Sequence, residues 1–294
     1  MRSKDFGMIE GVSKEFTAQE SLEMFKKMCR SRYFEFNVKK KYDAGLMPKI
    51  PIYLSVGEES ISSALAMSYK KPFIFAQHRC HDAYLAFGGG TRELIDELLG
   101  RPTGCARGMG GSASIHNPSI GMFGHSGLMG DQVPIAVGFA FAKKQNVLTI
   151  MGDASVEEDY VLGSFGYAAT KKAPVLFVCV DNGLSILTKV EVRRTWNMVN
   201  VAKSFGMPAI EIADDPWLIM HHVRRLENAL PAFLNIHTSR VLWHAGTGQD
   251  NEPEWDRFSL VKQELSNLGL GEESQKIEKE AQEYTAKIWE EATS

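Results

Sequence analysis

Short apolar runs alternate along this chain with longer stretches of helical periodicity. Runs of strand length lie at 73–76, 147–151, 175–180, 209–212 and 233–242. Apolar spacing predicts helices over 17–44, 57–69, 91–99, 133–143, 156–171 and 216–230, and a charged helix from 274 onwards. Thr17, three residues before Glu20, and Thr91 are suited to cap two of these helices. The alternation predicts an α/β fold in three layers, a mostly parallel sheet with helices on both faces.

The same pattern bears on domain organisation. No repeat and no low-complexity linker interrupts the alternation, and 294 residues with 44% apolar content suffice for one large domain. We therefore expect a tail over 1–16 and a single domain over 17–294, with an N-terminal helix and a C-terminal helical extension.

Composition narrows the possible settings. A net charge of -3 gives no reason to expect a nucleic-acid or anionic-membrane partner. The apolar runs are far shorter than a membrane span, and residues 1–14 lack the apolar core of an export signal. The four cysteines show neither paired nor metal-binding spacing. We expect a cytoplasmic, reducing location.

Two expected strands end on oxygen-bearing side chains. Asp153 follows the run at 147–151, and Asn182 follows the run at 175–180. Carboxylate, amide and carbonyl oxygens are the ligands that Mg²⁺ takes, and the backbone carbonyl of Leu184 is within reach of the same ion. Either end alone is most simply an ordinary turn after a strand. The pair, with its spacing and both strands, favours a metal that faces a phosphorylated ligand.

The residues around the first strand end suit a phosphate. Gly152 permits a tight turn from strand to helix. The backbone amides of Ala154 and Ser155 then open a helix and can face a phosphate group.

At this point the stretch from Gly152 to Asn182 resembles the thiamine diphosphate signature. From about Phe16 onwards, the chain resembles the alpha subunit of the thiamine-diphosphate-dependent 2-oxoacid dehydrogenase first component, a group that includes pyruvate, branched-chain and acetoin enzymes. The resemblance implies the thiamine-diphosphate-binding fold, with thiamine diphosphate and Mg²⁺ as cofactors. By the match, Asp153, Asn182 and the Leu184 carbonyl are the metal ligands, and Gly152, Ala154 and Ser155 lie at the cofactor. Ala154 and Asp181 depart from the family's glycine and asparagine without removing a ligand side chain.

The segment Gln77-His78-Arg79-Cys80-His81 resembles the family's Tyr or His followed by Arg. The resemblance implies that Arg79 grips the diphosphate and that His78 assists it. A surface salt bridge is the alternative for Arg79, and the role of His81 stays open.

The segment 121–134 is similar to the one that holds the aminopyrimidine ring in this family. The match implies that the backbone at Gly127 and Met129 bonds the ring and that Leu128 is the wedge that bends the cofactor. The alternative for Leu128 is an ordinary core leucine.

Three histidines that the family usually carries near the reacting carbon are absent. Tyr53, Ser114 and Gly246 stand at those positions, which suggests a changed substrate or a changed second half-reaction. His125 and His116 are additional histidines that could substitute, or they are solvent-facing loop residues. His125 and Leu128 are our catalytic candidates.

The resemblance also implies a partner, because the family's catalytic glutamate comes from a separate beta subunit. Glu157, Glu158 and Asp159 are most simply favourable charges in the first turn of a helix. We therefore expect activity only with a beta subunit, in an alpha2beta2 heterotetramer, with a lipoyl acyltransferase as a possible further partner. The expected reaction decarboxylates a 2-oxo acid and passes the acyl unit to a lipoyl group. The alternatives are a transketolase-like or carboligating enzyme that passes the enamine to an aldehyde, and a non-catalytic pseudo-subunit.

Overall fold

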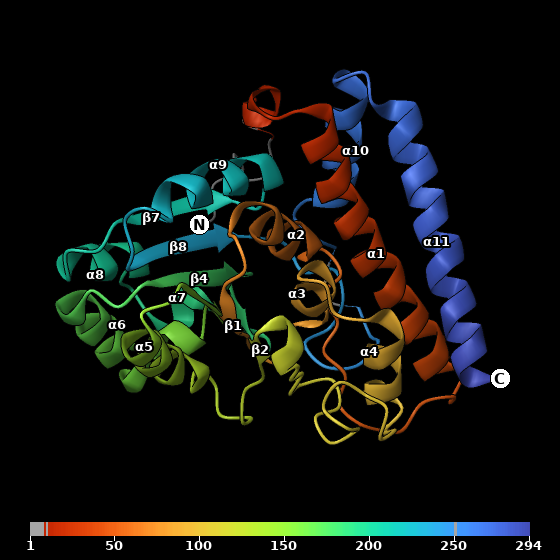
Figure 1. Cartoon of the computed structure of the whole chain (residues 1–294), viewed down its shortest axis with the longest axis horizontal. Coiled ribbons are helices and arrows are strands. Elements are labelled where there is room, and N and C mark those ends of the chain that lie inside the picture. Colours follow the sequence, from red (N-terminus) through yellow and green to blue (C-terminus); the bar gives the residue numbers. More distant parts are fainter. Residues whose placement is uncertain (1–8, 10, 250–251) are drawn as a thin grey trace.

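Six parallel strands form the central sheet, in the order β2-β1-β3-β4-β8-β7. They are β1 (Phe73–Phe75), β2 (Met122–Phe123), β3 (Val147–Gly152), β4 (Val175–Asp181), β7 (Ala209–Ala213) and β8 (Ala232–His237). A separate antiparallel hairpin joins β5 (Leu184–Ser185) and β6 (Thr188–Lys189). Figure 1 shows the sheet with helices packed on both sides. The expected fold class is confirmed.

The computed structural model describes residues 9, 11–249 and 252–294. Most of the expected tail, residues 1–8 and 10, lies outside the described residues. Val12–Glu15 forms a short 3-10 helix, η2. None of the helices in these ranges is long and apolar enough to cross a membrane.

Different helices cover the two faces of the sheet. One face packs against α1 (Ala18–Asp43), α2 (Glu59–Ser68), α3 (His81–Ala86), α4 (Thr91–Leu98) and α9 (Pro216–Leu226). The other packs against α5 (Gln132–Lys143), α6 (Asp159–Lys171) and α8 (Met198–Ser204). The remaining helices are η3 (Pro118–Ile120), η4 (Ser155–Glu157), α7 (Val190–Arg193), α10 (Arg257–Asn267) and α11 (Gly271–Thr293).

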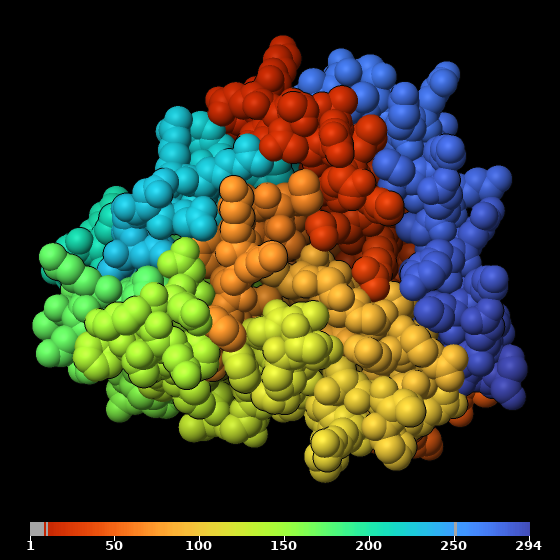
Figure 2. Space-filling model, viewed as in Figure 1, coloured from red at the N-terminus to blue at the C-terminus, as the bar shows by residue number. Residues whose placement is uncertain are grey.

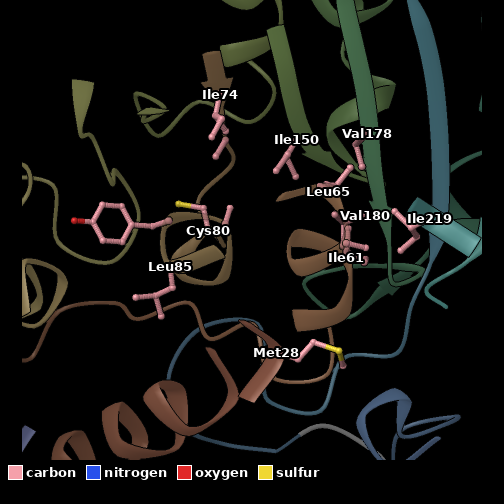
Figure 3. Close-up of a cluster of buried hydrophobic side chains, with 14 of the residues drawn as sticks. Met28, Ile61, Leu65, Ile74, Cys80, Leu85, Ile150, Val178, Val180 and Ile219 are labelled. Carbon is pink, nitrogen blue, oxygen red and sulfur yellow. The ribbon is translucent and has the colours of Figure 1, made fainter. Parts of the chain in front are cut away.

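Strand β4 illustrates why both faces are apolar. Leu176, Val178 and Val180 belong to the core on the α2 side, while Phe177 and Cys179 belong to the core on the α6 side. Successive strand residues point to opposite faces, so a strand covered on both sides reads as a continuous apolar run. Figure 3 shows strand residues of the core on the α2 side together with residues of α1, α2 and α9.

Helix α1 begins with the expected capping box. The Thr17 side chain accepts a hydrogen bond from the Glu20 backbone N–H at 3.2 Å, and the Thr17 backbone N–H donates to the Glu20 carboxylate at 2.9 Å. Helix α11 packs along α1, and the two lie side by side at one edge of the molecule (Figures 1 and 2). Residues of both helices belong to the core on the α2 side of the sheet.

Several expected boundaries were wrong. Thr91 is the first residue of α4 and not its cap; its hydroxyl instead accepts from the Arg30 side chain at 2.7 Å. The strand expected over 233–242 ends at His237, because the chain then turns to bond other segments: the Val241 N–H donates to the Val56 carbonyl at 3.1 Å. The helix expected over 216–230 ends at Leu226.

The helix expected over 156–171 is divided. A 3-10 turn, η4, ends at Glu157, and α6 begins at Asp159 with Glu158 as its N-cap residue. Only Asp159 of the three acidic residues therefore lies in the first turn of an α-helix. Glu157 instead makes ion pairs with Arg193 and Arg194, at 3.1 and 2.6 Å.

Candidate functional site

All the candidate segments lie at one edge of the sheet. His78 and Arg79 follow β1, the segment of 125–129 follows β2, and His244 lies in the loop after β8. Parallel strands present their carboxyl ends at a common edge, which is where open α/β sheets bind ligands. The sheet thus brings together residues that are far apart in sequence.

Asp153 and Asn182 come directly after the ends of β3 and β4, as expected. The two strands are neighbours in register, with Gly152 opposite Val180. Asp153 is buried, and burial together with the charge of Asp181 raises its pKa to about 7 against the opposing effect of Arg193 and Arg194.

Two consecutive arginines, Arg193 and Arg194, bond Asp153. Nη2 of Arg193 lies 2.5 Å from its Oδ2, and Nη1 of Arg194 donates to its backbone carbonyl at 2.5 Å. Both arginines come from the segment that follows the β5–β6 hairpin. The carboxylate is therefore already bonded to a cationic group, which a metal ion would share or displace.

Asn182 is connected to Arg79 through Glu58. Its Nδ2 donates to Oε1 of Glu58 at 2.8 Å, and the other Glu58 oxygen lies 3.5 Å from Nε of Arg79. Its Oδ1 accepts from the Leu184 N–H at 3.2 Å, which holds the metal-ligand candidates Asn182 and Leu184 together. Glu58 is not among the residues predicted from sequence. A signal was available, since this acidic residue starts a helix whose residues are otherwise almost all apolar or small.

Arg79 is buried, so the surface salt bridge weighed for it is wrong. Its guanidinium donates to the backbone carbonyls of Leu54 and His244, the latter at 2.9 Å. Burial lowers its pKa. A fixed guanidinium beside the strand ends is suited to phosphate oxygens, because its planar fork can donate two hydrogen bonds at once.

Four aromatic and imidazole rings meet beside Arg79; we call Tyr53, His78, His125 and His244 the imidazole cluster. The His78 ring centroid lies 4.7 Å from that of Tyr53, 5.9 Å from His125 and 5.4 Å from His244. His125 is 6% exposed, so the solvent-facing alternative for it is wrong. His116, by contrast, is exposed and packs on Phe123, outside the cluster.

Two imidazoles of the cluster, His78 and His125, have lowered pKa values. Burial and then the Arg79 charge lower the pKa of His78 to about 2, and burial lowers the pKa of His125. Both ring nitrogens of His78 and Nε2 of His125 are buried and have no hydrogen-bond partner within the described part of the chain. Buried polar atoms without partners are costly, so they point to a bound group that completes them.

The segment of 127–129 lies at the surface of this site. Leu128 is 61% exposed, so the core-leucine alternative is wrong. The Gly127 N–H donates to Nδ1 of His125 at 2.9 Å, and the Met129 carbonyl accepts from the Tyr160 hydroxyl. The segment is thus anchored on both sides of an exposed leucine.

The glycine-rich segment 104–112 surrounds a carboxylate. Glu97 of α4 is buried and accepts from four backbone N–H groups, those of Ala106, Gly108, Gly110 and Gly111, at 2.7–3.1 Å. Segment 104–112 lies at the surface next to α4 (yellow in Figure 2). The loop is therefore shaped from within by a helix residue.

The remaining candidates differ in position. Ser155 is buried in η4 and its backbone carbonyl lies close to Gly130, where a Cβ would meet it at 3.2 Å. At Gly152 an added Cβ would lie 3.1 Å from Oε1 of Gln77, so the strand end packs tightly against the segment after β1. His81 packs on Phe34 and bonds Glu35 and Ser112.

The described residues hold no group of three His, Cys, Asp or Glu side chains that could bind a metal. A metal at Asp153 would thus take one carboxylate, an amide and a carbonyl from the chain and its other oxygens from a ligand. That donor set fits Mg²⁺ shared with a phosphate. Together with the unpartnered nitrogens of His78 and His125, it fits a diphosphate cofactor at this edge.

A family model described as the dehydrogenase E1 component matches residues 26–245 of the chain. The chain belongs to the dehydrogenase E1 component family. The resemblance to thiamine-diphosphate-dependent 2-oxoacid dehydrogenases is confirmed, and this E1 chain is a component of such an enzyme.

Curated relatives agree with the family. The E1 chain is 30% identical over 243 residues to the pyruvate dehydrogenase E1 component subunit alpha of Rickettsia bellii, covering 77% of this chain and 73% of that protein. It is 31% identical over 176 residues to the mitochondrial subunit alpha-1 of Arabidopsis thaliana, covering 58% and 45%.

Solved structures show the fold. The E1 chain is similar to transketolase from Campylobacter jejuni, with a TM-score of 0.58 and 15% identity. The match covers 90% of this chain and 49% of the transketolase chain. A transketolase mutant from Pichia stipitis gives a TM-score of 0.56 at 13% identity. The chain thus spans about half the length of these transketolases, and at this identity the likeness concerns the fold alone.

Proposed function

We propose that this E1 chain is the alpha subunit of a thiamine diphosphate- and magnesium-dependent 2-oxoacid dehydrogenase, active only with a beta subunit. The observation that carries the proposal is the linked set of charged residues at one sheet edge. Asp153 and Asn182 lie at adjacent strand ends, and Glu58 joins Asn182 to the buried Arg79.

In this proposal the charged residues bind the diphosphate end of the cofactor. Asp153, Asn182 and the Leu184 carbonyl hold Mg²⁺, which offsets the diphosphate charge. Arg79 donates to diphosphate oxygens, and its bonds to two backbone carbonyls keep it in place. Gly152, Ala154 and Ser155 supply the close backbone beside the phosphates.

The neutral residues serve the chemistry. Thiamine diphosphate supplies a carbon that adds to the 2-oxo acid and accepts the electrons released as carbon dioxide leaves. Nδ1 of His125 accepts from the Gly127 N–H, so its neutral ring carries the proton on Nε2 and can donate it there, while the neutral His78 ring can offer one donor and one acceptor nitrogen. Gly127 and Met129 hold the aminopyrimidine through their backbone, and Leu128 is the wedge.

The exposed Leu128 supports a shared site. A leucine that bends a cofactor must be covered by apolar surface when the cofactor is bound, and this one is mostly exposed. The beta subunit would cover it and supply the glutamate that the cofactor needs. An alpha2beta2 heterotetramer follows from the resemblance, as does transfer of the acyl unit to a lipoyl acyltransferase.

The test is cofactor-dependent stabilisation. The chain and its beta partner are heated with thiamine diphosphate alone, with Mg²⁺ alone and with both. Only the combination should raise the melting temperature substantially, because a ligand that binds the native state stabilises it by a free energy that grows with the logarithm of its concentration over its Kd. No shift with both ligands in the presence of the partner would overturn the proposal.

The transketolase-like alternative keeps its support, because Gly246 stands where the family has a second histidine in the loop after the last strand. The first histidine of that loop, His244, packs against Tyr53 and His78. A non-catalytic scaffold has no need of a buried Arg79 or of unpartnered buried imidazole nitrogens. Product analysis with a 2-oxo acid and an aldehyde acceptor separates the two enzyme classes.

A further inference from the structure

Three buried polar side chains from distant parts of the sequence form a continuous hydrogen-bonded chain. Oε2 of Glu35, in α1, lies 3.2 Å from Nδ1 of His81, and Nε2 of His81 lies 2.9 Å from Oγ of Ser112. Each of the three side chains is at most 1% exposed. Ser112 Oγ also accepts from the Tyr53 backbone N–H at 2.9 Å.

Both ends of this chain are held by further bonds. Oε1 of Glu35 accepts from the Ser55 N–H at 3.2 Å and from the Ser55 hydroxyl at 2.8 Å. The two ring nitrogens of His81 bond Glu35 and Ser112, and the Ser112 oxygen accepts from the Tyr53 N–H.

The chain ends at the imidazole cluster. The Tyr53 ring lies 4.7 Å from His78 and 5.6 Å from His244. Tyr53 and Ser112 also line a cavity of about 280 Å³ together with Ile50, Pro51 and Met109. Ser112 therefore anchors the backbone of Tyr53, and Tyr53 belongs both to the imidazole cluster and to the lining of the cavity.

We propose that Glu35, His81 and Ser112 are positioning residues that hold Tyr53 against His78 and His244. A buried and fully bonded network of this kind fixes the orientation of the group at its end, as outer-shell partners do for catalytic side chains. Ser112 does not act as a nucleophile here, because its oxygen is buried and bonded to a backbone N–H. The inference rests on the proposed function, since the place of Tyr53 affects catalysis only if the imidazole cluster adjoins the reacting carbon.

The first test removes the hydroxyl in the assembled enzyme. Ser112→Ala should lower kcat by about 10- to 100-fold, because a displacement of about 1 Å near the reacting groups has that order of effect. The Kd for thiamine diphosphate with Mg²⁺ should stay within about threefold, since none of the bonds above reaches the metal-ligand candidates. The Tyr53 amide should exchange its hydrogen faster with solvent.

The matched control is Ser68→Ala. Ser68 is also buried, but its hydroxyl donates to the Ala64 carbonyl of its own helix, at 2.7 Å. This variant should leave kcat and the Tyr53 amide unchanged. Ser112→Thr keeps a hydroxyl and should restore most of the lost kcat.

A double-mutant cycle separates positioning from general destabilisation. In a Tyr53→Ala background, Ser112→Ala should change kcat less than twofold, because there is no ring left to position. If the two losses multiply, Ser112 acts independently of Tyr53 and the inference is wrong. Should Ser112→Ala fail to fold, His81→Asn is tested in the same cycle with the same expectation.

The outcomes distinguish this inference from the proposed function. If the unmodified complex binds no thiamine diphosphate, the proposed function fails. If the unmodified complex is active while Ser112→Ala has its normal kcat and normal Tyr53 amide exchange, only the positioning role is overturned.

Discussion

We call Asp153, Asn182, Glu58 and Arg79 the charged edge. It lies beside the imidazole cluster, yet the two regions differ in how their polar groups are paired. At the charged edge, carboxylates and guanidinium groups are paired: Asp153 with Arg193, and Glu58 with Arg79. In the imidazole cluster, rings pack on rings, and nitrogens of His78 and His125 have no partner in the described chain. Arg79 connects the two, since it pairs with Glu58 and donates to the His244 carbonyl.

The difference teaches which task each region suits. Paired charges at strand ends need little movement to accept a metal and a diphosphate, so that region suits binding. Neutral imidazoles kept from water can donate and accept hydrogen bonds without carrying a charge, so the cluster suits contact with the reacting groups. The predictions below test this division, beginning with the largest effect.

Asp153→Ala should break the charged edge. It removes the carboxylate among the metal-ligand candidates, so cofactor affinity should fall by more than the roughly 10- to 100-fold typical of an outer-shell partner. Titration calorimetry with thiamine diphosphate and Mg²⁺ measures the change. Asp159→Ala is the control, because that residue is exposed at the start of α6 and should leave affinity unchanged. Undiminished binding by Asp153→Ala would show that the metal assignment is wrong.

His125→Ala should affect the cluster more than the charged edge. A lost proton-transfer group lowers kcat by about 10²- to 10⁴-fold, whereas cofactor affinity should fall by less, through loss of the bond that Nδ1 accepts from the Gly127 N–H. Steady-state kinetics of the assembled enzyme together with calorimetry gives both quantities. His116→Ala, on the exposed histidine nearby, should be silent in both. If His125→Ala weakens cofactor binding as strongly as it lowers kcat, the two regions do not divide the work as described.

Glu58→Ala should damage both regions, because Glu58 joins Asn182 to Arg79. Removing one partner of a buried ion pair leaves an uncompensated charge, which costs about 3–5 kcal/mol of unfolding free energy. Chemical denaturation of the chain measures this loss. Glu15→Ala, which removes a carboxylate that is paired with His221 but more than half exposed, is the comparison and should cost far less. Equal costs for the two variants would contradict the burial argument.

His78→Phe should change the acid stability of the chain. The pKa of His78 is lowered to about 2 in the folded state from an ordinary value of 6.5, so the unfolded chain binds the extra proton first. Its contribution to stability is therefore complete above about pH 6.5 and declines as the pH falls toward 2. The phenylalanine variant should lose less stability between pH 7 and pH 4 than the unmodified chain. Unfolding curves at several pH values decide this, and parallel losses would refute it.

Thr17→Ala lies away from both regions and should have the smallest effect. Loss of the N-cap costs about 1 kcal/mol of stability. Cofactor affinity and kcat should be unaffected, since the capping box is confined to the start of α1. A change in either would show that α1 transmits strain to the site through Glu35.

The sequence predicted the charged edge better than the cluster, for a physical reason. Asp153 and Asn182 directly follow strands, so periodicity alone places them at the sheet edge. The cluster assembles from four loops, and ring contacts between Tyr53, His78 and His244 depend on tertiary packing that no local pattern reports. The sequence named His78 and His125 as candidates, but only the fold shows that they lie beside Tyr53 and His244.

Boundaries failed where tertiary bonds overrode local propensity. The strand after Ala232 stops at His237 because the following residues bond the segment before α2. Gly57 lies there in a positive φ of 100°, and an added Cβ would lie 2.5 Å from the Ser239 carbonyl oxygen. Such a close approach of two backbones is invisible in sequence, although the glycine itself is a hint.

The Glu97 carboxylate within the glycine-rich loop has a further consequence. Loops of this kind usually take their form from the anion they enclose, and lose it when the anion departs. Here the anion is the Glu97 side chain of the protein itself, so the loop is preorganised. The four N–H groups that bond Glu97 have their partner without any bound ligand. Side chains on the outer side of segment 104–112 can therefore change without altering the path of its backbone.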